Sequence, residues 1–152
     1  MTITILDKWR FDASLSNQCI SDENVEERIN TFFISINDSF GTPEKPHFKE
    51  NHSNVLNLFF DDIETDLLLK DFDTKEDIFV KCFTDEQAKE VIKFVDLNKD
   101  KSQCIIHCTA GVSRSGAIGK FISEYIPNSI LDAHNRISPN PIVYEKLKLF
   151  GR

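Results

Sequence analysis

The residues best suited to chemistry lie in one short run, residues 107–116 (HCTAGVSRSG). An apolar strand is expected to deliver Cys108, five mostly small residues form a loop, and Arg114 begins a helix. A loop between a strand and a helix N-terminus points consecutive backbone N–H groups into one concavity, which binds a phosphate or a similar oxyanion. Gly111 permits a left-handed backbone within this loop. Because the guanidinium of Arg114 adds a planar fork of donors, the run predicts a phosphate-binding loop between a strand and a helix.

The same positive environment favours the thiolate of Cys108. A free cysteine has a pKa of about 8.5, and helix N-termini with nearby cations lower it by several units. A thiolate that attacks a phosphate ester in line forms a covalent phosphocysteine, so we expect a two-step reaction. Ser115 carries a hydroxyl that can stabilise the departing thiolate in the second step. The alternatives are a buried cysteine without chemistry and an ordinary serine at the start of a helix.

Local patterns predict the elements that position this loop. Strands are expected at residues 2–6, 31–36, 55–60 and 103–107, where β-branched and aromatic residues are frequent. Helices are expected at residues 85–97, 114–125 and 139–150, where apolar residues recur at helical spacing. Thr84 and Gln87 match a capping box before the first of these helices. Strands that alternate with helices predict an α/β fold, a single domain over residues 1–152 with a central, mostly parallel sheet flanked by helices.

Other segments are less well defined. Trp9 and Phe11 are compatible with a continuation of the first strand, and residues 23–29 favour a helix. Residues 41–53 contain two prolines and predict a loop. Residues 63–82 are rich in Asp and Lys and ambiguous in structure, and residues 78–83 are compatible with an extended segment.

The run His-Cys-x-x-Gly-x-x-Arg-Ser resembles the signature of protein tyrosine phosphatases, and Ala-Gly-Val-Ser-Arg-Ser-Gly is similar to the dual-specificity branch. The resemblance covers about residues 31–150 in its order of elements. It includes an Arg…Pro-Asn…Leu tail made by Arg136, Pro139, Asn140 and Leu147. Two features depart from the family: Pro141 follows the Asn where the family usually has Gly, and the stretch before Cys108 is longer than in compact members.

The resemblance implies a role for each residue of the loop. Cys108 is implied to be the nucleophile, Arg114 the phosphate clamp and Ser115 a helper in the second step. The implied substrate-binding residues are Thr109, Ala110, Gly111, Val112, Ser113 and Arg114. His107 is implied to support the site by hydrogen-bonding near Cys108, and Asn140 is a second supporting residue. The alternative for His107 is a satisfied strand histidine.

In this superfamily an Asp on a loop after a strand protonates the leaving group. The strand at residues 55–60 ends at Asp61 and Asp62, and neighbouring strand residues face opposite ways, so one role should belong to one of them. We expect the general acid to be Asp62, because Asp-Ile resembles the acid-bearing turn of the family. Asp61 is the alternative, and both are otherwise solvated strand-end residues. Weaker candidates lie on the less defined segment: Asp66, Asp71 and Asp73.

The composition restricts partners and location. The formal net charge of −7 disfavours nucleic acids and anionic membranes. Neither a signal peptide nor an apolar run of membrane-spanning length is recognisable, so we expect a cytoplasmic protein without membrane insertion. Free thiols are therefore expected at Cys19, Cys82 and Cys104. The Cys and His spacing matches no zinc motif, and neither a metal nor another cofactor is expected.

These features predict a cysteine-dependent protein phosphatase that hydrolyses phosphotyrosine through a phosphocysteine, with phosphoserine and phosphothreonine as further substrates left open. Its partners would be phosphorylated proteins. A phosphoinositide or RNA 5′-phosphatase on the same fold is the first alternative. The loop lacks the additional Lys that phosphoinositide enzymes of this superfamily often use, and the acidic charge disfavours RNA. A non-catalytic phosphopeptide-binding module is the second alternative.

Overall fold

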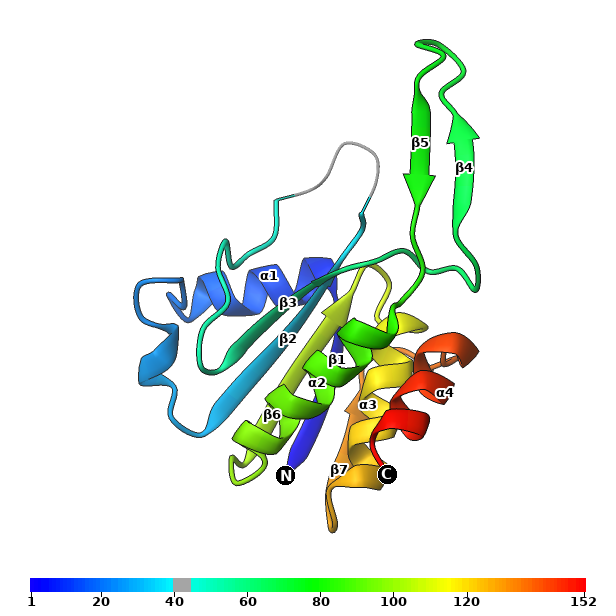
Figure 1. Cartoon of the computed structure of the whole chain (residues 1–152). Helices are drawn as coiled ribbons and strands as arrows, with labels where there is room; N and C mark the ends of the chain where they lie inside the picture. Colours follow the sequence, from blue (N-terminus) through cyan, green and yellow to red (C-terminus); the bar gives the residue numbers. More distant parts are fainter. Residues whose placement is uncertain (40–44) are drawn as a thin grey trace.

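The computed structural model describes residues 1–39 and 45–152 (Figure 1). Within these residues, five parallel strands form one sheet in the order β3-β2-β6-β1-β7. Its strands are β1 (Thr2–Asp7), β2 (Thr31–Asn37), β3 (Val55–Phe59), β6 (Gln103–Cys108) and β7 (Ile130–Ala133). The helices are α1 (Lys8–Asn17), α2 (Asp85–Asn98), α3 (Arg114–Tyr125) and α4 (Pro141–Phe150). The expected α/β fold with a parallel sheet is confirmed.

Helices cover both faces of the sheet. Helices α2, α3 and α4 pack on one face, and α1 packs on the other (Figure 1). Strand β2 shows the division: Phe32 and Ile34 face the larger core under α2–α4, whereas Phe33 faces the smaller core under α1. In a parallel sheet covered on both faces, side chains on both sides of a strand are buried, as they are at nearly every position of β2.

Several predicted elements are confirmed in detail. Helix α3 covers the expected residues 114–125, and α2 begins with the capping box of Thr84 and Gln87. Pro141 is the first residue of α4, where its missing N–H costs no hydrogen bond. Of the loop expected at residues 41–53, residues 41–44 lie outside the described residues, and the remainder contains neither helix nor strand.

The expectation for the segment after β1 was wrong. Trp9 and Phe11 belong to α1 and do not continue the strand. Asp7 ends β1 and caps the helix, because its carboxylate accepts the N–H of Arg10 at 2.8 Å. The helical period was inconspicuous because Phe11 and Leu15 are the buried residues of this helix. The helix expected at residues 23–29 is only a short 3-10 turn, η1 (Val25–Glu27), and β7 was not predicted.

The undefined segment at residues 63–82 contains a hairpin of β4 (Leu67–Lys70) and β5 (Asp77–Val80). The hairpin projects beyond the carboxyl ends of the sheet strands (Figure 1). It exposes large apolar side chains, among them Leu68 and Phe79, which lie opposite each other. Among the described residues, no helix has the length and apolar character needed to cross a bilayer.

Candidate active site

The loop at residues 109–113 connects the carboxyl end of β6 to α3 and packs directly on the end of β1. Gly111 has φ +69°, as its expected left-handed conformation requires. A Cβ at this position would lie 2.7 Å from the backbone nitrogen of Asp7 and 2.7 Å from the carbonyl carbon of Leu6. Glycine is therefore needed both for the backbone conformation and for the close approach of two chain segments.

Hydrogen-bond donors outside the loop bind most of its carbonyl oxygens. The Lys8 N–H donates to the Thr109 carbonyl at 3.2 Å, and the Asn135 side chain donates to the Ala110 carbonyl at 3.0 Å. Backbone N–H groups that follow α3 donate to the carbonyls of Val112 and Ser113 at 3.0 and 3.1 Å. The N–H groups of Val112 and Ser115 instead lower the pKa of the Cys108 thiol. The loop therefore binds its surroundings through oxygen atoms and directs N–H donors toward the cysteine.

Cys108 lies at the base of this loop and is 2% exposed. Its sulfur is 3.1 Å from the Ser115 hydroxyl oxygen. Burial opposes ionisation, but the hydroxyl and N–H of Ser115, the charge of Arg114 and the Val112 N–H together lower the pKa of the Cys108 thiol. Cys104, four residues earlier on β6, has no such donors, and burial raises its pKa well above the usual value. The contrast shows that the loop, and not burial in the sheet, favours a thiolate at Cys108.

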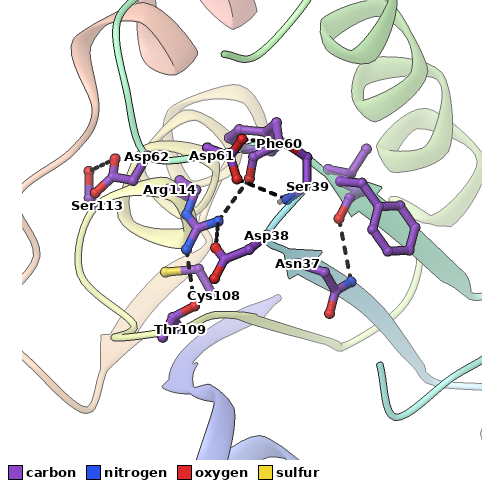
Figure 2. Close-up of polar contacts among 12 residues, drawn as sticks. Asn37, Asp38, Ser39, Phe60, Asp61, Asp62, Cys108, Thr109, Ser113 and Arg114 are labelled. Atoms are coloured by element: carbon purple, nitrogen blue, oxygen red, sulfur yellow. Dashed lines mark hydrogen bonds and ion pairs between the residues drawn. The ribbon is translucent and has the colours of Figure 1, made fainter. Parts of the chain in front are cut away.

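Arg114 is buried against three acceptors (Figure 2). Its Nη1 donates to the Asp38 carboxylate at 2.7 Å and to the Phe60 carbonyl at 2.8 Å, and its Nη2 donates to the Thr109 hydroxyl at 3.1 Å. Within residues 1–39 and 45–152, Nε and the second Nη2 hydrogen have no hydrogen-bond partner. One edge of the guanidinium is therefore held in place, and the Nε–Nη2 edge retains donors for two oxygens of an anion.

Asp38 was not predicted as part of the site. It follows β2, the strand beside β6, and lies 76 residues from Arg114 in the sequence. The adjacent carboxyl ends of parallel strands bring the two side chains together. An acidic residue two positions after the strand expected at residues 31–36 was the only available signal.

Asp61 and Asp62 have different surroundings (Figure 2). The Asp61 carboxylate is 2% exposed and accepts hydrogen bonds from the Ser39 N–H, the Ser39 hydroxyl and the Lys81 N–H. Asp62 is exposed, and its Oδ1 accepts the Ser113 hydroxyl at 2.7 Å. Asp62 therefore contacts the loop beside Cys108, whereas Asp61 joins two neighbouring segments.

Asn140 connects Asp62 to the start of α4. Its amide nitrogen donates to Asp62 Oδ1 at 2.9 Å and to the Ile63 carbonyl at 3.3 Å. Its amide oxygen caps α4 by accepting the N–H groups of Ile142 and Val143. The weaker acid candidates lie on the hairpin, where Asp66 accepts the Cys82 N–H and Asp71 accepts the N–H groups of Asp73 and Thr74.

His107 lies under the loop and is completely buried. Its Nε2 is 2.6 Å from the Ser35 hydroxyl, and its Nδ1 is 3.3 Å from the Cys108 carbonyl. Burial lowers the pKa of His107 to about 4, so the ring is neutral at pH 7. We assign the proton to Nδ1, because the carbonyl can only accept and the hydroxyl can donate to Nε2. His107 thus links β2 to the backbone of Cys108.

Comparison of the chain with protein-family models, curated proteins and solved structures finds no match. All four cysteines are free thiols. In the described part of the chain, no three His, Cys, Asp or Glu side chains are grouped as metal ligands would be. The chemistry of the site must therefore be inferred from its own geometry: a thiol of lowered pKa, an anchored guanidinium and a carboxylate lie around one loop.

Proposed function

We propose that the protein is a cysteine-dependent phosphatase that hydrolyses phosphotyrosine in proteins through a phosphocysteine intermediate. The observation that carries this proposal is the pairing of Cys108 with Arg114. The sulfur has a lowered pKa, and the guanidinium retains donors on one edge while Asp38 and Phe60 hold the other. A thiolate beside an anion clamp suits attack on a bound phosphate better than attack on an uncharged group.

In the first step, the Nε–Nη2 edge of Arg114 and loop N–H groups bind the non-bridging phosphate oxygens. The Cys108 sulfur attacks phosphorus, the S–P bond forms, and the bond from phosphorus to the ester oxygen breaks. Protonated Asp62 donates its proton to that oxygen, and the hydrogen bonds from Ser113 and Asn140 hold the carboxyl group at the loop.

In the second step, water attacks phosphorus and the S–P bond breaks. The Asp62 carboxylate accepts the proton of the water, which restores the acid for the next cycle. The departing sulfur takes up the bonding electrons as a thiolate. The Ser115 hydroxyl lies 3.1 Å away and donates to it. Because Cys108 must stay reduced for this cycle, the activity requires a reducing compartment such as the cytoplasm.

The preferred leaving group follows from the chemistry of phosphate esters. A phenol leaves more readily than the alcohol of serine or threonine, so phosphotyrosine should be hydrolysed faster than phosphoserine or phosphothreonine. The net charge of −7 also disfavours RNA as a substrate. A panel of phosphotyrosyl, phosphoseryl and phosphothreonyl peptides, a phosphoinositide and an RNA 5′-phosphate separates these substrate classes. A clear preference for any member over phosphotyrosine would contradict the proposal.

The decisive variant is Cys108→Ser, which removes the thiolate and keeps the loop. Phosphotyrosyl-peptide turnover should vanish while peptide binding persists, and vanadate should inhibit the parent competitively. Cys19→Ser is the matched control, because Cys19 is an exposed thiol, and it should retain parental turnover. Substantial turnover by Cys108→Ser would refute the nucleophile, and binding without turnover by the parent would favour a phosphopeptide-binding module.

A further inference from the structure

The sheet has a switch point beside the candidate nucleophile. Strands β1 and β6 are neighbours, with Asp7 paired in register with Cys108. Helix α1 follows β1 onto one face of the sheet, and α3 follows β6 onto the opposite face (Figure 1). Where the connections after adjacent parallel strands diverge in this way, a crevice opens at the carboxyl ends of the strands, and ligands of open α/β sheets bind there.

A cavity of about 590 Å³ lies on the α1 side of this switch point. Its walls include Lys8, Trp9 and Asp12 of α1, together with Lys45 and Thr109. Thr109 follows the nucleophile directly, and its hydroxyl accepts a hydrogen bond from Arg114. The cavity therefore adjoins the loop of the candidate active site. Its volume is within the range of ligand pockets, so it can take more of a substrate than a phosphate group.

Trp9 supplies the largest aromatic surface in the wall of this cavity. It is the single Trp of the chain, and it is 75% exposed at the cavity wall. The Arg10 guanidinium lies 5.7 Å from the indole centroid and is itself paired with Asp7. An indole supported in this way offers apolar area at low entropic cost, which is why Trp is enriched among residues that dominate binding.

The charges of the cavity wall include one matched ion pair, so the choice of an aromatic or apolar occupant rests on the exposed indole of Trp9. The Lys8 ammonium is 2.8 Å from the Asp12 carboxylate and 3.3 Å from the Lys45 carbonyl oxygen. The charge of Lys8 is thus matched within the wall by Asp12, and Lys45 adds a further cation to the lining. A neutral planar or apolar group can bury the indole without displacing this ion pair.

We propose that the cavity is a specificity subsite for an aromatic or large apolar side chain adjacent to phosphotyrosine in a peptide substrate, with Trp9 as its main contact. The inference rests on the proposed phosphatase function. It restricts the substrate class to phosphopeptides with such a neighbouring side chain. The phosphate would lie over the loop at residues 109–113, with the neighbouring side chain against α1.

The experiment uses phosphotyrosyl peptides in which Phe replaces Ala at each of the two positions on either side of phosphotyrosine. At one position, Phe should raise kcat/KM of the parent protein by about tenfold, the effect of one well-buried aromatic contact. Trp9→Ala should reduce this preference to less than about twofold, since its contact is gone. Ile29→Ala is the matched control: Ile29 is 73% exposed but lies before β2, at the amino ends of the sheet strands, so the preference should remain.

A binding measurement separates the subsite from catalysis. In Cys108→Ser, the fluorescence of the single Trp should change when the preferred Phe peptide binds and stay constant with the matched Ala peptide. A parent that hydrolyses the peptides without preference for Phe at any position overturns the subsite and leaves the phosphatase intact. Preference that persists in Trp9→Ala also overturns it. Fluorescence-detected binding by Cys108→Ser, without turnover by the parent, would support the subsite and refute the phosphatase.

Discussion

Exchange of each neighbouring aspartate for asparagine should separate a catalytic carboxylate from a structural one. Asp62→Asn keeps an oxygen at Oδ1, so the hydrogen bonds from Ser113 and Asn140 survive, with the new amide group in the place of Oδ2. The substitution removes only the transferable proton. We expect turnover of phosphotyrosine to fall by about 10²–10⁴ and the alkaline decline in rate to disappear. A highly activated leaving group, which needs no proton, should be affected far less.

Asp61→Asn should have the opposite profile. Its two carboxylate oxygens accept the Ser39 N–H at 2.8 Å and the Lys81 N–H at 2.7 Å. Asparagine supplies one oxygen, so its amide group must face one of these donors and leave a part-buried N–H without a partner. Such a loss costs about 1–3 kcal/mol. A destabilisation of about 2 kcal/mol lowers the Tm of a chain of this size by about 4–8 °C.

The assay pairs thermal unfolding with pH–rate profiles for both variants, measured well below the lower Tm. Asp62→Asn should unfold within about 0.5 kcal/mol of the parent, as surface substitutions do. If Asp61→Asn instead loses the alkaline limb while Asp62→Asn behaves as the parent, the acid is Asp61. If both retain the limb, neither carboxylate protonates the leaving group, and the proposed first step is wrong.

Three further outcomes test the loop and its support. Ser115→Ala should slow breakdown of phosphocysteine, so rapid mixing with an aryl phosphate should show a burst of phenol followed by slow turnover; a full steady-state rate without a burst would contradict this. Gly111→Ala should lower the free energy of unfolding by more than about 1 kcal/mol in urea titrations, since the left-handed backbone alone costs that much and the Leu6–Asp7 backbone adds a clash. The pKa of His107 in the folded protein is lowered to about 4. Below pH 6.5 the unfolded chain therefore binds a proton at this ring, whereas the folded protein does not until the pH approaches 4. Stability should therefore fall by about 3 kcal/mol from pH 6.5 to 4 through this residue, and His107→Gln should remove that part of the slope.

The parts of the site that could be predicted are contiguous in sequence. Cys108, Gly111 and Arg114 lie within seven residues, and a strand, a loop and a helix determine their relative positions almost without help from the rest of the chain. Asp38 could not be predicted as the partner of Arg114, because their contact depends on β2 lying beside β6. Trp9 was misassigned for a local reason: the buried face of α1 is too narrow for a clear helical period.

Strand β7 was not predicted because it, too, depends on a neighbour that is distant in sequence. It has four residues at the sheet edge, and Ile130 is 65% exposed, so neither length nor apolar pattern indicated a strand. Its pairing with β1 exists only after α3 has brought the chain across the sheet. Edge strands depend on their single neighbour more than on their own sequence.

Asp62 can stay at the loop although the chain leaves the sheet soon after it, because that departure is the β4–β5 hairpin (Figure 1). Asp61 joins the two ends of the segment that contains this hairpin. Its N–H donates to the Lys81 carbonyl at 2.7 Å, and its carboxylate accepts the Lys81 N–H. The two ends of the segment that contains the hairpin are therefore joined, and α2 begins soon after this junction. Because Asp61 holds this junction, Asp62 is free to contact Ser113 at the loop. The two aspartates thus depend on each other: one maintains the backbone position from which the other reaches the site.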